Sequence, residues 1–274
     1  MMTKLHRLIC SVALVAGVAC ADVLEDKIQE LIGPQSYTQN KNFINSIFAN
    51  QSRFYLGNGA LNVGAVVYAL KNNGLLLLKF PSPMELSVTF KSKTSVPALS
   101  YTMNALLSSM GYSYFMLSQA SKVDGLSSIS YSLVTEHALD PIVLLQELEK
   151  RGFVLQDMGR KAVNDWSYTI QVRDIRLFNA RAINASESLS LREVSGQYWL
   201  SVPKGGGSLK IIANAKWIPR IVGYDTNLQI VQTIIEQSPR AEFSVRLDSA
   251  SAFVMITDAE NPGTIKQIEV GFKP

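Results

Sequence analysis

Cysteine and histidine are almost absent from this 274-residue sequence. Both cysteines, Cys10 and Cys20, lie in the first 20 residues, and His137 is the only histidine beyond them. A disulfide framework is therefore excluded there, and a Cys/His zinc site lacks its ligands. His137, with Asp140 close by, is the only histidine that could serve a serine nucleophile as base, and no G-x-S-x-G motif accompanies it. The surroundings favour a structural role for His137.

Long apolar runs are confined to the N-terminus. Within residues 1–21, two basic residues precede the apolar run 8–18, and an A-x-A site follows the run. This order predicts a secretory signal peptide that is cleaved after residue 21. The alternative is a lipoprotein signal with an acylated Cys20, but Gly17 stands where such a signal wants a large aliphatic residue. No later run approaches the roughly 18 apolar residues of a membrane helix. We therefore expect a periplasmic protein.

A strong excess of one charge is also missing. Of the 26 basic side chains, Lys4 and Arg7 belong to the predicted signal peptide, which holds no acidic residue. The remainder has 24 basic and 22 acidic side chains, a net charge of +2. Mixed charges near neutrality exclude the footprint of a nucleic-acid-binding protein. Hydrophobic residues make up 47% of the chain, so a packed core is expected to stabilise the fold.

Residues 22–83 read as an N-terminal helical region. Apolar residues recur at helical spacing over Val23–Ile32 and Asn42–Ala49. Asn62 is positioned to cap a third helix, which Asn72-Asn73-Gly74 ends. The four leucines of Leu75–Leu78 are too few for a membrane anchor and are predicted to form a buried strand.

Residues 84–173 repeat one pattern, strand, helix, strand. In the first copy, the strand MELSVTF precedes a predicted helix from Val96 to Met110, and the next strand begins with YSYFML. In the second copy, the strand SSISYSLV precedes a predicted helix from Pro141 to Arg151, which Asp140 caps. FVLQDM and WSYTIQV then form a hairpin. We predict a split β-α-β-β-α-β sandwich with both helices on one face of an antiparallel sheet, and we expect Ser127–Ser132 to lie on an exposed edge where a partner could add a strand.

In residues 174–274, apolar residues no longer recur at helical spacing. About eight strand-like runs separated by turn residues predict an antiparallel β-sandwich; they lie at residues 175–183, 188–194, 197–202, 208–218, 227–236, 241–247, 252–257 and 265–272. The fold class expected for the whole chain is therefore α+β.

Two features of the sandwich invite a functional interpretation. Lys204–Ser208 resembles a phosphate-binding loop, but it lacks G-x-x-x-x-G-K-[ST] and strands flank it, which favours a flexible hairpin loop. Four aromatic residues could stack on a sugar or fill the core, and the core is favoured; they are Tyr198, Trp199, Trp217 and Tyr224. We expect no catalytic, metal-binding or cofactor-binding residues.

NKNFINSIFANQSRFYLGNG, KNNGLLLLKF, MELSVTF and LLSSMGYSYF together resemble exported envelope proteins of spiral-shaped, flagellated bacteria. The resemblance covers roughly residues 40–114 and rests on no invariant motif. It implies an accessory role in the flagellar motor or its outer-membrane-associated disk. The central topology also resembles the small periplasmic modules of secretins and TonB-dependent receptors, which self-associate or dock partners.

These observations favour a non-enzymatic periplasmic scaffold or interaction protein of a cell-envelope assembly, flagellar if the resemblance holds. The expected partners are envelope proteins of a flagellar or secretion assembly, and peripheral membrane association and self-association stay open. One alternative is a periplasmic protein that binds a glycan or another small ligand through the sandwich aromatics. Another is a hydrolase with paired carboxylates, which composition cannot exclude.

Overall fold

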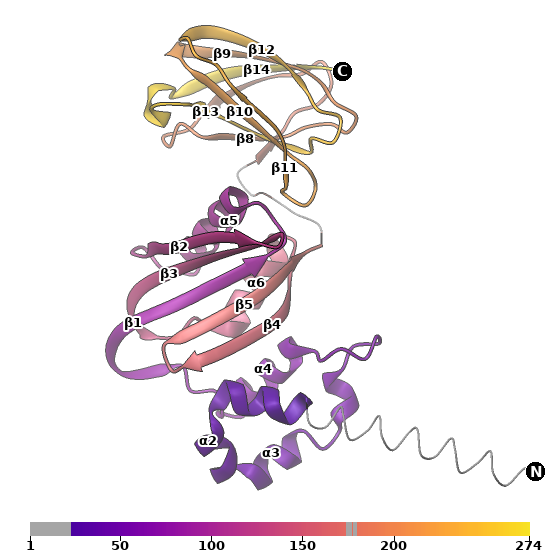
Figure 1. Cartoon of the computed structure of the whole chain (residues 1–274), viewed down its shortest axis with the longest axis vertical. Helices are drawn as coiled ribbons and strands as arrows, with labels where there is room; N and C mark the ends of the chain where they lie inside the picture. The colour runs from indigo at the N-terminus through magenta and orange to yellow at the C-terminus, as the bar shows by residue number, and fades with distance from the viewer. Residues whose placement is uncertain (1–22, 174–176, 178–179) are drawn as a thin grey trace, which may run out of the picture.

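A computed structural model describes residues 23–173, residue 177 and residues 180–274. Three units follow one another along the long axis, the N-terminal helices, a central α/β unit and a β-sandwich (Figure 1). This arrangement confirms the α+β class. The predicted signal peptide lies outside the described residues and stays a prediction. Within the described part, no helix is long and apolar enough to cross a membrane.

The N-terminal region contains more helix than predicted. A first helix covers residues 23–32, and Pro34 then begins a helix of its own instead of only stopping the first. Asn62 caps α4 as expected, its Oδ1 accepting from the Ala65 N–H at 3.1 Å. The elements of this region are α2 (Pro34–Gln39), α3 (Lys41–Ile47), η1 (Gln51–Phe54) and α4 (Val63–Asn72).

The prediction of a strand over Leu75–Leu78 is wrong. These leucines have no regular secondary structure, and β1 begins only at Lys79. Leu75 and Leu76 are buried whereas Leu77 is 69% exposed. Two side chains of the run therefore enter the core without strand pairing. Because β1 starts at Lys79, the predicted boundary at residue 83 lies inside this strand.

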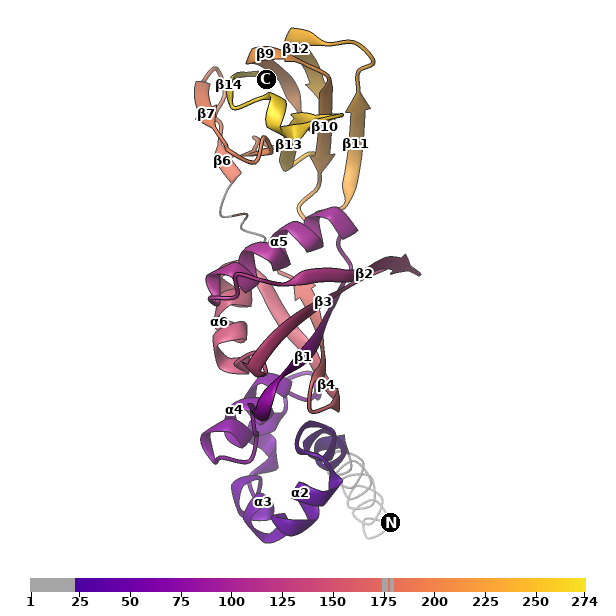
Figure 2. The ribbon, with the colours of Figure 1, turned by 90° about the vertical axis from the view of Figure 1, so that its left-hand side faces the viewer.

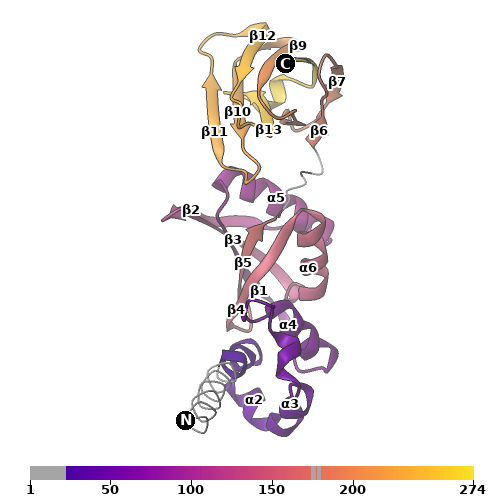
Figure 3. The ribbon, with the colours of Figure 1, turned by 90° about the vertical axis from the view of Figure 1, so that its right-hand side faces the viewer.

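The central unit is a five-stranded, mostly antiparallel sheet in the order β2-β3-β1-β5-β4. Helices α5 and α6 lie on one face, and among the described elements no helix covers the other face (Figures 2 and 3). β1 pairs antiparallel with β3 but parallel with β5. The elements are β1 (Lys79–Ser92), α5 (Val96–Ser109), β2 (Met116–Val123), β3 (Leu126–His137), α6 (Pro141–Lys150), β4 (Phe153–Ala162) and β5 (Asp165–Val172).

Buried and exposed side chains alternate along β1 and β3, which explains why the helices cover only one face of the central sheet. Leu86, Val88 and Phe90 are buried on the helical face, while polar and charged residues of β1 such as Glu85 and Thr89 occupy the face without helices. Asp140 caps α6, as predicted, accepting from the Ile142 N–H at 3.0 Å. Two predictions need correction. β2 starts at Met116, four residues later than YSYFML suggested, and β3 pairs on both sides, so it is not an edge.

The sandwich is confirmed, with nine strands in two sheets ordered β11-β10-β13-β8-β6 and β12-β9-β14-β7 within the described residues. β10 escaped prediction because only Ile218 separates it from β9. The first predicted run, residues 175–183, lies partly outside the described residues. The elements are β6 (Ala180–Ala182), β7 (Ser188–Arg192), β8 (Tyr198–Ser201), β9 (Gly207–Trp217), β10 (Pro219–Tyr224), β11 (Ile230–Ile235), β12 (Arg240–Leu247), β13 (Phe253–Asp258), η2 (Pro262–Thr264) and β14 (Gln267–Lys273).

The glycine-rich Lys204–Ser208 segment does not form a hairpin loop. It leads from β8 in one sheet to β9 in the other. Gly207 has a φ of 155°, and a Cβ there would lie 2.4 Å from the Phe272 ring and 2.6 Å from the Lys273 carbonyl oxygen. Close packing between strands therefore accounts for this glycine, and no helix follows that could bind a phosphate.

Candidate functional site

The two edges of the central sheet differ. Along β4, the helix of residues 23–32 covers the edge, because the Lys27 ammonium donates to the Met158 carbonyl at 3.2 Å and lies 2.8 Å from an Asp157 carboxylate oxygen. The Arg160 guanidinium donates to the Leu31 carbonyl at 2.9 Å. No described strand pairs with the outer side of β2. β2 is therefore the uncovered edge of this sheet.

Exposed apolar side chains accompany this free edge. Met116 is 71% exposed, Leu117 48% and Val123 65%. Native proteins usually protect an edge strand with charges or bulges. β2 has one bulge, between Leu117 and Gln119, and one charge, Lys122. The Lys122 ammonium donates to the Gln229 side-chain oxygen at 3.0 Å, so this charge is directed toward the sandwich. The edge is poorly protected against pairing with another strand.

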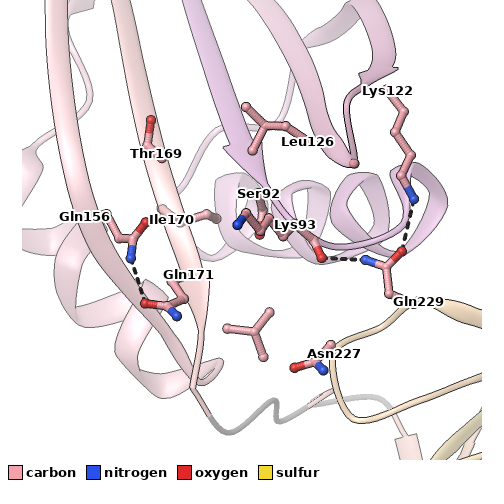
Figure 4. Close-up of a pocket in the computed structure, with 12 residues that line it drawn as sticks. Ser92, Lys93, Lys122, Leu126, Gln156, Thr169, Ile170, Gln171, Asn227 and Gln229 are labelled. Atoms are coloured by element: carbon pink, nitrogen blue, oxygen red, sulfur yellow. Dashed lines mark hydrogen bonds between the residues drawn. The ribbon is translucent and has the colours of Figure 1, made fainter.

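A cleft of about 600 Å³ lies where the end of the central sheet meets the sandwich (Figure 4). Residues of all five central strands and of the loop between β10 and β11 contribute to its wall. The lining residues are Ser92, Lys93, Lys122, Gly125, Leu126, Gln156, Thr169, Ile170, Gln171, Val172, Asn227 and Gln229. Four carboxamides and two lysines stand among them, and none carries a carboxylate.

The loop that brings Asn227 and Gln229 to the cleft has a local cause. The Asp225 side chain accepts from the N–H groups of both residues at 2.8 Å, which closes a compact turn. Leu228, fully buried, has a φ of 57°, a conformation rarely seen for a bulky residue. Its carbonyl accepts from the Ser95 N–H at 3.0 Å. The loop is thereby fixed to the start of α5.

Contacts between the central unit and the sandwich extend beyond this loop. Trp199 stacks on Tyr101 of α5 with ring centroids 4.5 Å apart, and on Tyr224 with centroids 5.2 Å apart. The Gln229 amide also donates to the Lys93 carbonyl (Figure 4). Trp199, Tyr224 and Leu228 belong to the same hydrophobic core as the central unit. The two units therefore share a packed joint beside the cleft.

The burial of the four sandwich aromatics is inconsistent with the alternative that they form a platform for stacking on a sugar. Tyr198, Trp199, Trp217 and Tyr224 are each at most 3% exposed, so none presents a ring face to solvent. Trp217 and Tyr198 fill the space between the two sandwich sheets. Burial raises the pKa of Tyr224 to about 12, although the nearby Arg220 acts in the opposite direction. These aromatics serve packing, as the sequence favoured.

His137 lies at the exposed end of β3, where its backbone N–H contacts the Thr135 hydroxyl at 3.2 Å. Asp140, the nearest candidate partner in sequence, is engaged elsewhere, capping α6 and accepting from the Lys71 ammonium at 2.5 Å. Burial alone would raise the pKa of Asp140, but the hydrogen bonds from Lys71 and from the α6 N–H groups lower it. No group of three or more potential metal ligands occurs in the described part of the chain.

The most perturbed carboxylate joins the two central helices. The Lys150 ammonium donates to Glu147 at 2.6 Å, and despite burial this bond, with those from Arg151 and Ser109, lowers the pKa of Glu147 to about 2. Arg151 also donates to the Ala105 carbonyl of α5 at 3.2 Å. These contacts lie between α5 and α6, and none of the four side chains lines the cleft. They indicate a structural clamp and not a catalytic group.

No protein-family model matches this chain, and no curated protein matches it. A pre-peptidase C-terminal domain of collagenase from Bacillus anthracis is similar in structure at 9% sequence identity and a TM-score of 0.27, over 36% of this chain and 98% of that one. A β-glucosidase from Paenibacillus barengoltzii is similar at 14% identity and a TM-score of 0.21, over 34% of this chain and 11% of that one. Similarity this low carries no argument about function.

Proposed function

We propose that this chain is a non-enzymatic, periplasmic interaction protein of a cell-envelope assembly, and that β2 is its docking strand. The observation that carries the proposal is the contrast between the two sheet edges. β4 is covered by the chain's own helix, whereas β2 exposes an unpaired backbone and apolar side chains. An extended segment of a partner would satisfy this backbone by strand addition. The resemblance over residues 40–114 supports a flagellar assembly as the setting.

The test replaces two exposed apolar side chains near the ends of β2 with lysine, Met116→Lys together with Val123→Lys. Charges on an edge oppose pairing with a further strand. The matched control is Val163→Lys with Val194→Lys, two exposed valines in turns away from β2. Each tagged variant is expressed in its own cells, crosslinked and purified. Envelope proteins recovered with the wild type and the control should be absent from the β2 variant.

If the β2 variant retains the same partners as the control, strand addition at β2 is wrong. The flagellar setting is tested separately, since deletion of the gene should impair motility and the recovered proteins should include motor or disk components. Export is tested by mass spectrometry of the purified chain. It should begin at Asp22 without a lipid, and an acylated N-terminal Cys20 would instead place the protein on a membrane surface.

A further inference from the structure

The cleft at the end of the central sheet is elongated. Its wall takes residues from β2, β3, β1, β5 and β4 in the order in which the strands lie side by side. Four interstrand spacings of about 4.8 Å give a length of about 19 Å. An extended peptide advances about 3.3 Å per residue, so five or six residues match this length. The volume of about 600 Å³ lies within the ordinary range of ligand sites.

The polar groups of the cleft suit a peptide backbone. A carboxamide offers two N–H donors and one oxygen acceptor, the same groups that a peptide unit presents. The Gln156 amide donates to the Gln171 oxygen at 2.6 Å, and the Gln171 NH2 group, which has no acceptor among the described residues, faces the cleft (Figure 4). The Asn227 amide likewise makes no side-chain hydrogen bond in the described structure. Sugar sites usually add an aromatic stacking surface, and no aromatic residue lines this cleft.

The charged residues of the cleft favour a ligand that carries negative charge. Lys93 and Lys122 both line it, and neither forms an ion pair with a carboxylate in the part of the chain that the structure describes. Because no acidic side chain lines the wall, Lys93 and Lys122 give the lining residues a net positive charge. Carboxylates of a ligand would find two ammonium groups that no internal carboxylate occupies, although the Lys122 ammonium also donates to the Gln229 side-chain oxygen.

We propose that this cleft binds a short, extended, acidic peptide segment. The inference rests on the proposed function in one respect, that the segment belongs to a protein partner. Peptide units hydrogen-bond to Gln171 and Asn227, and carboxylate side chains lie near Lys93 and Lys122. Leu126 and Val172, which are partly exposed, supply apolar contact along the wall.

The probe is an acetylated, amidated hexapeptide of alternating glutamate and alanine, titrated into the ¹⁵N-labelled chain. The side-chain NH2 resonances of Gln156, Gln171 and Asn227 report directly on the cleft. They should shift in a saturable manner with the acidic peptide. The same peptide with glutamine in place of glutamate should produce no saturable shift, and higher salt should weaken binding of the acidic form.

Charge reversal at Lys93 provides the variant. Lys93→Glu should weaken binding of the acidic peptide at least about tenfold, because it places like charges together. The matched control, Lys41→Glu, makes the same change in net charge on α3, which lies beyond the central unit at the end of the molecule away from the sandwich (Figure 1). It should alter the affinity by less than about twofold, since screening removes interactions over such distances. Asn227→Ala should weaken the acidic peptide while leaving its salt dependence unchanged.

Several results would overturn the proposal. These are no saturable shift at millimolar peptide, equal binding of the glutamine peptide, or equal effects of Lys93→Glu and Lys41→Glu. Saturable binding of the acidic disaccharide N-acetylglucosaminyl-N-acetylmuramic acid with no binding of the peptide would assign the cleft to glycan instead. Neither variant lies on β2, so failure here leaves docking at β2 intact. Loss of partners from the β2 variant alone likewise says nothing against the cleft.

Discussion

Leu228 is the residue on which the joint between the central unit and the sandwich can be tested most directly. Its side chain is fully buried in the shared core, and its φ of 57° costs about 1–2 kcal/mol relative to an ordinary conformation. Leu228→Ala keeps a Cβ and therefore keeps this backbone cost. The substitution removes only packing, and truncation of a buried leucine lowers the free energy of unfolding by about 3–5 kcal/mol.

Leu228→Gly makes the prediction sharper. In ordinary conformations glycine is less stable than alanine by about 1 kcal/mol. At a positive φ glycine relieves the strain, so Leu228→Gly should be no more destabilising than Leu228→Ala. Urea unfolding followed by tryptophan fluorescence and circular dichroism measures both values. The control, Leu209→Ala, opens a cavity in the sandwich interior, where Leu209 is equally buried.

Only the Leu228 variants should shift the native side-chain amide resonances of Asn227 and Gln229, because only they disturb the loop beside the cleft. The reasoning is refuted if Leu228→Ala costs less than about 1 kcal/mol, the typical cost of a point substitution of any kind. It is refuted equally if Leu228→Gly is clearly less stable than Leu228→Ala, since the backbone would then carry no strain.

Three further predictions concern stability and chemistry. The pKa of Glu147 in the folded chain is about 2, below its ordinary 4.5, chiefly because of Lys150 and also because of Arg151. The ionised Glu147 therefore contributes about 1–3 kcal/mol to the free energy of unfolding above pH 4.5, and this contribution is lost as the pH falls toward 2. In acid unfolding, Glu147→Gln should make the free energy of unfolding depend less on pH over that interval. Gly196→Ala should cost at least about 2 kcal/mol in thermal unfolding, because φ is +65° and a Cβ would lie 1.6 Å from a backbone oxygen; an unchanged melting temperature would contradict this. His137→Ala should keep both the fold and the crosslinked partners, and loss of function in a folded, partner-binding variant would reopen the search for an enzyme.

Local signals in the sequence predicted the two helices with side-chain caps, α4 and α6, well. Asn62 and the Asp140-Pro141 pair act on the backbone within three residues of themselves, so their effect is readable without tertiary structure. Alternation along the sandwich strands was readable for the same reason. β10 was missed because Ile218 alone separates it from β9, although Pro219, which follows directly, is a residue that can begin a strand.

Strand order and burial depend on partners distant in sequence, and there the predictions failed. The run Ser127–Ser132 appeared suited to an edge, yet β1 and β2 enclose it on both sides. Leu75 and Leu76 are apolar enough for a strand, yet they pack into the core without one. The cleft was equally hidden, because its amides come from β4, β5 and a loop more than 50 residues further along the chain. Single glutamines and asparagines carry no spacing signal.

The two proposed surfaces meet at Lys122, and this decides which substitutions can separate them. Lys122 belongs to β2, but its ammonium contacts Gln229 on the far wall of the cleft. A substitution at Lys122 removes a cleft charge and also the only charge of the edge strand, so its effect on partner binding has two causes. Lys93 lies after the end of β1 and Val123 is an exposed residue of β2, so each alters one surface. Those two positions therefore distinguish a peptide held in the cleft from a strand added at the edge.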